Sequence, residues 1–269
     1  MSLTIKSDKA HSGVNLPHYQ AMLDHQARVI ADGGTIPSAD RCLQLLRFLA
    51  CNGFDLADCY VYGAEFGIKE NAGAITKFYN PAHGGMDALV NAGTVTKNTV
   101  AYPYVTASTS NSQQIRTAGT IPIGGKCIIA GASNVAAPGY MILAALNPFE
   151  VYSSTENVAQ LLYNDTANTN YGFAKNDVNA QIQILSSVAA VGMDGLACLI
   201  TGAAGSIYAN GAKTGSGAFT SKKLNASVWV NIVAGVSTAA TMGVAIVITD
   251  KSATEANAQK LSAFLGTNY

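Results

Sequence analysis

The chain has 269 residues, of which 49% are hydrophobic and 12% are charged, about half the charged share of an ordinary soluble domain. Sixteen Lys and Arg residues balance sixteen Asp and Glu residues, so the formal net charge is zero. This excludes the strongly basic surface that holds nucleic acid or an anionic membrane, and neither is expected as a partner. So little charge also favours association of the chain with copies of itself.

Residues 1–85 are expected to form an N-terminal arm and a helical segment. The first 16 or so residues are polar and rich in turn formers, whereas apolar residues recur every three or four positions from Pro17 to Ala31, which predicts an amphipathic helix. Ser38 is a candidate N-cap for a second helix, which Asn52-Gly53 closes. Two helices this short need a partner, either the rest of the chain or another subunit.

Residues 86–269 are expected to form an antiparallel β-sandwich. The helical period disappears from about Met86, and short apolar or alternating segments follow, separated by Gly, Asn, Ser and Thr. This pattern is typical of a sandwich or jelly roll and not of alternating strands and helices. The candidate strands are residues 99–106, 115–123, 126–130, 141–145, 160–163, 171–174, 180–187, 196–201, 206–209, 228–234 and 243–249.

Three features mark the last part of the predicted sandwich. Asn210-Gly211 predicts a tight β-hairpin, because this dipeptide supplies the two positive φ angles of a type I′ turn. Val244–Ile248 is apolar on both faces, which predicts a strand that is covered on both sides. A helix over residues 252–265 is expected to lie back over the sandwich, with Ser252 and Glu255 as its capping box and Gly266 as its C-terminal cap.

The order of several short motifs resembles a known family. The matching segments are Ala31-Asp32-Gly33-Gly34, Leu45–Asp55, Lys77-Phe78-Tyr79-Asn80-Pro81, the hairpin at Tyr208-Ala209-Asn210-Gly211, and the final strand and helix from Met242 to Gly266. Together they resemble the concanavalin-type, laminin-G-like β-sandwich (jelly roll) of tailed-bacteriophage virion proteins. The matches cover about a third of the chain, and Phe54 stands where the family usually has a Trp.

The resemblance implies a non-enzymatic structural component of a bacteriophage particle, acting through protein–protein contacts. Capsid decoration, a collar or neck position, and a tail or baseplate appendage all fit this role. The partners would be the chain itself, as a homotrimer, and other virion proteins. The N-terminus shows no secretory signal and no segment has about eighteen consecutive apolar residues, so the chain is expected to be assembled in the host cytoplasm and to reside in the virion.

The alternative interpretation is a carbohydrate-binding module for adhesion to a host-surface glycan. A sugar platform needs exposed aromatic rings with polar neighbours. The candidate rings are Tyr102, Tyr104, Tyr152, Tyr163, Tyr171 and Tyr208, although aromatic residues on strands also alternate into the core. Trp229, the only tryptophan, is flanked by valines and is expected in the core.

No catalytic or cofactor-binding constellation is found in the sequence, and the chain is not expected to be an enzyme. A glycoside hydrolase needs two carboxyl groups about 5 Å apart, or about 6.5–9.5 Å apart, across a groove. The Glu-x-Asp-x-x-Glu tract of concanavalin-type hydrolases is absent. The glycines at 202–205 and at 124–125 lack the full phosphate-loop pattern and are predicted to be turns. The remaining candidates for a catalytic carboxyl pair are scattered along the chain and form no such tract. They are Glu150, Glu156, Asp165, Asp177 and Asp194.

No metal site is expected either. His18 and His25 are seven residues apart, which is not the three- or four-residue spacing of a helical metal pair, and Asp165 and Asp177 alone do not make a calcium site. The five cysteines contain no Cys-x-x-Cys motif and are expected to be reduced and mostly buried. The alternative is cross-linking after release from the cell, with Cys51 and Cys59 as the participants.

Overall fold

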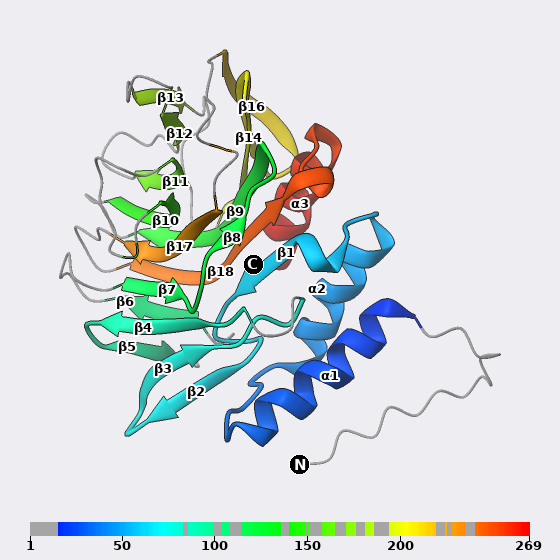
Figure 1. The fold of residues 1–269 in the computed structure, drawn as a ribbon, viewed down its shortest axis with the longest axis vertical. Coiled ribbons are helices and arrows are strands. Elements are labelled where there is room, and N and C mark those ends of the chain that lie inside the picture. Colours follow the sequence, from blue (N-terminus) through cyan, green and yellow to red (C-terminus); the bar gives the residue numbers. More distant parts are fainter. Residues whose placement is uncertain are drawn as a thin grey trace.

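The chain folds as two antiparallel sheets, with helices packed against the outer face of one of them (Figure 1). This arrangement is seen in a computed structural model. It describes residues 16–82, 86–98, 104–107, 114–135, 140–148, 150, 158–164, 171–175, 181–185, 194–218, 224, 227–234 and 240–269.

Three α-helices lie within the described residues, and none of them is both long and apolar enough to span a bilayer. Helix α1 (Pro17–Ala31) and helix α2 (Ala39–Cys51) have the predicted bounds. Helix α3 (Glu255–Asn268) ends the chain, and the 3-10 turns η1 (Leu56–Asp58) and η3 (Asp250–Ser252) precede β1 and α3.

The predicted strands are confirmed where the structure describes them, except that the strand expected at 115–123 is broken into two short strands by a bend at residues 118–120. Several strands that the sequence did not predict are added. The additional strands are β1 to β5, which hold short or polar segments. The bounds are β1 (Cys59–Tyr62), β2 (Ile68–Asn71), β3 (Ala74–Phe78), β4 (Ala88–Ala92), β5 (Val95–Asn98), β6 (Tyr104–Ala107), β7 (Gln114–Thr117), β8 (Ile121–Pro122), β9 (Lys126–Val135), β10 (Tyr140–Asn147), β11 (Ala159–Asn164), β12 (Tyr171–Lys175), β13 (Gln181–Leu185), β14 (Asp194–Thr201), β15 (Ala204–Ala209), β16 (Ala212–Ala218), β17 (Ser227–Ala234) and β18 (Ala240–Thr249).

The first sheet is built around β9 and β18. Strand β9 pairs with β18 on one side and β14 on the other, and β15 and β16 continue the sheet beyond β14. The far edge of β18 pairs with β1 and, further along, with β6. Asn210 and Gly211 have φ angles of 48° and 88°, so the predicted hairpin between β15 and β16 is confirmed.

The second sheet runs β4–β7–β17–β10–β11–β12–β13, with every pair antiparallel. Strand β3 connects the two sheets, because it pairs with β4 and also with β5, whose other neighbour is β6. Strands β1 to β3 thus join the sandwich although they precede residue 86. The division of the chain at residue 85 stays a prediction.

Two hydrophobic clusters hold the layers together, and β18 contributes to both. Ala245 and Val247 face the core between the sheets, whereas Val244, Ile246 and Ile248 face the cluster beneath the helices. The prediction of a final strand covered on both sides is therefore confirmed. Alternation along one strand supplies both layers, since successive side chains point to opposite faces.

Helix α3 lies on β14 and β15, and two glycines allow the close approach. A Cβ at Gly195 would come within 2.2 Å of the Gly266 nitrogen, and one at Gly266 within 2.0 Å of the Asn210 side chain. Gly266 was predicted as the C-terminal cap, which is wrong, because the helix continues to Asn268. Its role is to bring the helix against the hairpin turn.

The predicted capping box of this helix is also displaced. Thr254 is the N-cap, and its hydroxyl accepts a hydrogen bond from the Asn257 amide at 3.2 Å. The Ser252 hydroxyl instead accepts from the Asp55 amide and donates to Asp58, at 3.0 Å each. Ser252 therefore ties η3 to η1, and a hydroxyl used in this way is not available to cap α3.

Candidate functional site

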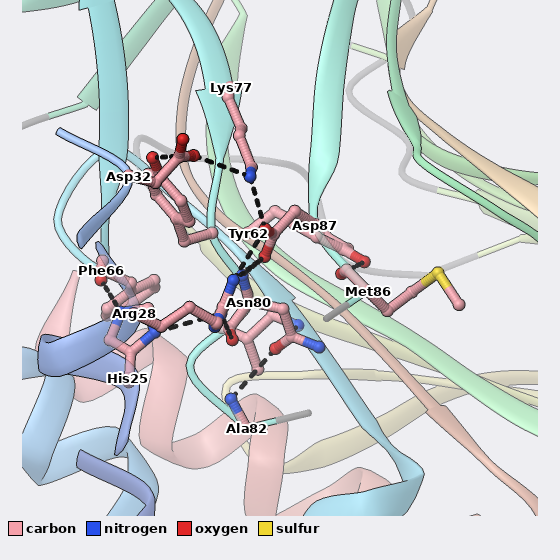
Figure 2. Close-up of polar contacts among 12 residues, drawn as sticks. His25, Arg28, Asp32, Tyr62, Phe66, Lys77, Asn80, Ala82, Met86 and Asp87 are labelled. Atoms are coloured by element: carbon pink, nitrogen blue, oxygen red, sulfur yellow. Dashed lines mark hydrogen bonds and ion pairs between the residues drawn. The ribbon is translucent and has the colours of Figure 1, made fainter. Parts of the chain in front are cut away.

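A polar cleft of about 500 Å³ lies between α1 and the segment that follows β3. Two of its lining residues, Arg28 and Asn80, belong to a network of polar contacts that joins α1 to the sandwich (Figure 2). The lining residues are Pro17, Gln20, Ala21, Asp24, His25, Arg28, Asn80, Pro81 and Ala82.

Arg28 is the centre of this network. Its Nη1 donates to both carboxylate oxygens of Asp87, at 2.6 and 2.7 Å, and its Nη2 donates to the Asn80 carbonyl at 2.8 Å. Lys77 bridges Asp87, at 2.9 Å, to Asp32 at the end of α1, at 3.0 Å. Hydrogen bonds from Tyr79 and from two lysines hold the pKa of Asp32 well below its usual range.

Asn80 fixes the backbone beneath the cleft. Its side-chain oxygen accepts from the amides of Val61 and Ala82, at 3.1 Å each, and its Nδ2 donates to the Cys59 carbonyl at 3.3 Å. Its own amide donates to Asp87. Asn80 is fully buried, so these bonds replace contacts with water that folding removes.

The two histidines of α1 are buried, and His25 points to the backbone. Its Nε2 donates to the Phe66 carbonyl at 2.5 Å, and burial lowers its pKa to about 4, so the ring is neutral at pH 7.

Among the described residues, no group of three or more His, Cys, Asp or Glu side chains is placed to hold a metal ion. Cys42, Cys59, Cys127 and Cys198 are buried thiols, whereas Cys51 is exposed.

The cleft therefore serves mainly to anchor α1. Arg28 is already paired with Asp87 and Asn80, Asp24 accepts from Gln20, and His25 is committed to a carbonyl. A second polar region has a different character, because some of its buried polar atoms have no partner. It lies on the outer face of the second sheet.

One cross-strand row of residues crosses this outer face, and we call it the outer row. The strand registers place these residues opposite one another in sequence from β4 to β11. The members are Leu89, Arg116, Asn231, Ala145 and Gln160. Their neighbours along the strands, including Ile115, Val230, Ile232, Ala144 and Leu161, face the core between the sheets.

Arg116 and Trp229 meet at one end of the outer row. The Arg116 guanidinium lies over the Trp229 ring, 4.9 Å from its centroid, and donates to the carbonyl of Glu150 at 2.9 Å and to its carboxylate at 2.7 Å. The Glu150 side chain is 61% exposed, whereas that of Arg116 is only 16% exposed. We refer to Arg116, Trp229, Asn231 and Glu150 as the Arg116 site.

Three buried polar atoms of the Arg116 site lack a hydrogen-bond partner. They are Nε of Arg116 and both side-chain atoms of Asn231, Nδ2 and Oδ1. Asn231 is fully buried and stands directly opposite Arg116 across the β7–β17 pair. Such orphaned groups are uncommon in folded proteins, and each costs about 1–3 kcal/mol.

The structure corrects the expectation for Trp229. It was predicted to lie in the core, but Val228 and Val230 occupy the core and the alternation of β17 turns Trp229 to the outer face, where it is only half-buried. Tyr208 lies in the cluster beneath the helices and not on a sugar platform. Arg116 and Asn231 carried no signal in the sequence, since only the pairing of β7 with β17 brings them together.

Several other predicted candidates lie outside the described residues. Tyr102, Tyr152, Glu156, Asp165, Asp177 and His83 belong to this group, so their roles stay predictions. Tyr104, Tyr163 and Tyr171 lie on β6, β11 and β12, but the description does not extend to their side chains. Asp194 begins β14 in the first sheet, away from the outer row.

No protein-family model matches the chain, and no curated protein matches it. Solved structures of similar fold do exist. The binding domain of Paraclostridial Mosquitocidal Protein 1 is 10% identical, with a TM-score of 0.53 over 80% of this chain and 53% of that one. The botulinum neurotoxin serotype D binding domain is 12% identical, with a TM-score of 0.52 over 76% and 50% of the two chains.

A structure of the receptor binding domain of botulinum neurotoxin D gives 11% identity and a TM-score of 0.50 over 76% and 52% of the two chains. The present chain thus spans about half the length of the solved structures that it matches. At this level of identity the likeness concerns the fold alone. It supports the β-sandwich, whereas the bacteriophage role and the trimer stay predictions.

Proposed function

We propose that the chain is a carbohydrate-binding domain that holds its ligand at the Arg116 site. The observation that carries this proposal is a half-buried tryptophan beside buried polar atoms without partners. A sugar ring offers an apolar C–H face to an aromatic ring and hydroxyl groups to planar amide and guanidinium groups. Trp229 fits the first requirement, and the Arg116 guanidinium, whose Nη atoms bind the exposed Glu150, fits the second.

The solved structures of similar fold also support a binding role. The three described above are binding domains by name, and one is a receptor binding domain. Because they are similar in fold alone, the ligand of the present chain has to be argued from its own residues.

We further propose that the ligand is bound and not cleaved. Hydrolysis of a glycosidic bond needs two carboxyl groups on either side of it. Strands β4, β7, β17, β10 and β11 contain no Asp or Glu, and the described carboxylate that contacts Arg116 is Glu150. Incubation of the protein with host-surface polysaccharide should release no new reducing ends, and release of reducing ends would contradict this part of the proposal.

Binding is tested with an array of neutral and acidic oligosaccharides, followed by titration calorimetry. We expect dissociation constants of about 1 mM or lower, and Trp229→Ala should weaken binding about tenfold or more. Tyr19→Ala is a matched control, because it removes a half-buried aromatic ring from α1, far from the second sheet. Absence of binding at about 10 mM ligand, or equal loss in both variants, would overturn the proposal.

A second candidate function is that of a structural subunit in an assembly such as a bacteriophage particle. The observation that favours it is an apolar stripe on the outer face of α1. Leu16, Leu23 and Ile30 are spaced by seven residues and are 39%, 52% and 62% exposed. Sedimentation at about 0.1 mM should then show a trimer that the double change Leu23→Gln and Ile30→Gln dissociates. A monomer at that concentration would exclude this candidate.

A further inference from the structure

Arg116 is the only charged residue on five neighbouring strands of the second sheet. Strands β4, β7, β17, β10 and β11 contain no Asp, Glu or Lys, and no other Arg. A cation that is mostly buried on an otherwise uncharged sheet needs a negative partner, because an unpaired charge is costly in such surroundings. The sheet itself provides none.

The partner that Arg116 now has comes from outside the strands. Glu150 accepts through one carboxylate oxygen, at 2.7 Å, and through its backbone carbonyl, at 2.9 Å. Its side chain is 61% exposed, and an ion pair with so exposed a partner contributes about 0–1 kcal/mol. The Arg116 guanidinium, by contrast, is held in place against Trp229. An incoming acid group can therefore replace the Glu150 carboxylate while the guanidinium stays where it is.

The orphaned atoms differ from the groups that a ligand can reach. Nε of Arg116 and both side-chain polar atoms of Asn231 have no hydrogen-bond partner, and Asn231 is fully buried opposite Arg116. The groups that a ligand can reach are therefore the guanidinium Nη atoms, which now bind the exposed Glu150, and the half-buried Trp229 ring. A cation beside an aromatic face matches an acid group carried on a sugar ring.

We infer that the Arg116 site binds an acidic saccharide, whose carboxylate or sulfate group takes the place of the Glu150 carboxylate on Arg116. The apolar face of the sugar lies against Trp229. This inference rests on the proposed glycan-binding function and narrows it to a class of ligand. Glu150 acts as an internal competitor that fills the site when no ligand is bound.

Titration calorimetry of the full chain with two pairs of probes tests the inference. Oligogalacturonate is compared with its methyl ester, which removes the carboxylate charge, and dextran sulfate is compared with dextran, which tests a sulfate source. We expect at least one acidic probe to bind roughly ten times or more tighter than its neutral counterpart, and binding should weaken as salt rises.

Two variants assign the effect to the named residues. Arg116→Gln should weaken binding of the acidic probe by roughly 10- to 100-fold, since it removes charge-assisted hydrogen bonds. Glu150→Gln should tighten the same binding by up to about fivefold, because it removes the competitor. Circular dichroism and thermal unfolding of both variants separate loss of binding from loss of fold, and Glu150→Gln alters only an exposed side chain.

The outcomes separate this inference from the function on which it rests. Equal affinity for charged and neutral probes, with Trp229→Ala still weakening both, would overturn the acidic ligand and leave glycan binding in place. If the Glu150→Gln variant binds the acidic probe more weakly than the unchanged chain does, the acidic-ligand inference is also overturned. Glu150 would then be part of the site and not a competitor for it. Failure of every saccharide to bind would remove the proposed function and the inference together.

Discussion

Replacing Asn80 by alanine should strongly destabilise the protein, although it removes no charge and little apolar surface. The side chain makes three hydrogen bonds, to Val61, Ala82 and Cys59, and is fully buried. Each bond contributes about 1 kcal/mol, and the Val61 amide, which is buried, would lose this acceptor at a further cost of about 1–3 kcal/mol. We therefore expect the free energy of unfolding to fall by about 4–6 kcal/mol.

Urea denaturation followed by circular dichroism measures this change. Asn52→Ala is the matched control, because the Asn52 side chain donates to the Phe48 carbonyl at 2.8 Å, at the partly exposed end of α2. That variant should lose less than about 1 kcal/mol. If the two variants unfold at the same urea concentration, the assignment of Asn80 as the residue that fixes the β1 and β3 backbones is wrong.

Three further predictions concern pH, the last helix and its glycine contact. The pKa of His25 is lowered to about 4 in the folded chain and is about 6.5 in the unfolded chain. The neutral ring therefore contributes fully to the free energy of unfolding above pH 6.5, and this contribution is lost as the pH falls toward 4. This loss amounts to about 3 kcal/mol, and His25→Gln should flatten the pH dependence of unfolding in that window; an unchanged slope would contradict the burial argument. Thr254→Ala should cost about 1 kcal/mol by thermal unfolding, whereas Ser206→Ala, whose contact with Glu255 is 3.4 Å long, should cost less. Gly195→Ala should cost about 1–3 kcal/mol or displace α3, since the new Cβ would meet helix backbone at 2.2 Å, whereas Gly119→Ala has 3.6 Å of space and should be tolerated.

Much of the fold could be predicted because its signals are local. The bounds of α1 and α2 follow from apolar spacing over a few turns, and the β15–β16 hairpin follows from Asn210-Gly211. Strands β1 to β3 gave no such signal. All four residues of β1 are buried and so show no alternation, and β2 and β3 are short and include the polar stretch Lys69-Glu70-Asn71.

The Arg116 site could not be predicted, because it depends on pairings between strands that are distant in the chain. Arg116 on β7 meets Asn231 on β17 only when the second sheet has formed. The position of Trp229 shows the limit of local reasoning most clearly. The local sequence Val-Trp-Val allows the tryptophan to point either into the core between the sheets or to the outer face of the second sheet. Only the register of β17 with its neighbours decides between these two faces.

The placement of the helices explains why the outer face of the second sheet is suited to binding. Helices α2 and α3 cover the first sheet, and their apolar cluster includes residues of β9, β14 and β18 (Figure 1). Within the described residues, no helix packs against the outer face of the second sheet. Burying Asn231 and Nε of Arg116 there without partners weakens the fold by the cost of each orphaned group. Apolar residues at these two positions would remove that cost, so a binding role of the Arg116 guanidinium is the best explanation of the pair. Adding an acidic saccharide should therefore raise the stability of the unchanged chain more than it raises that of the Arg116→Gln variant.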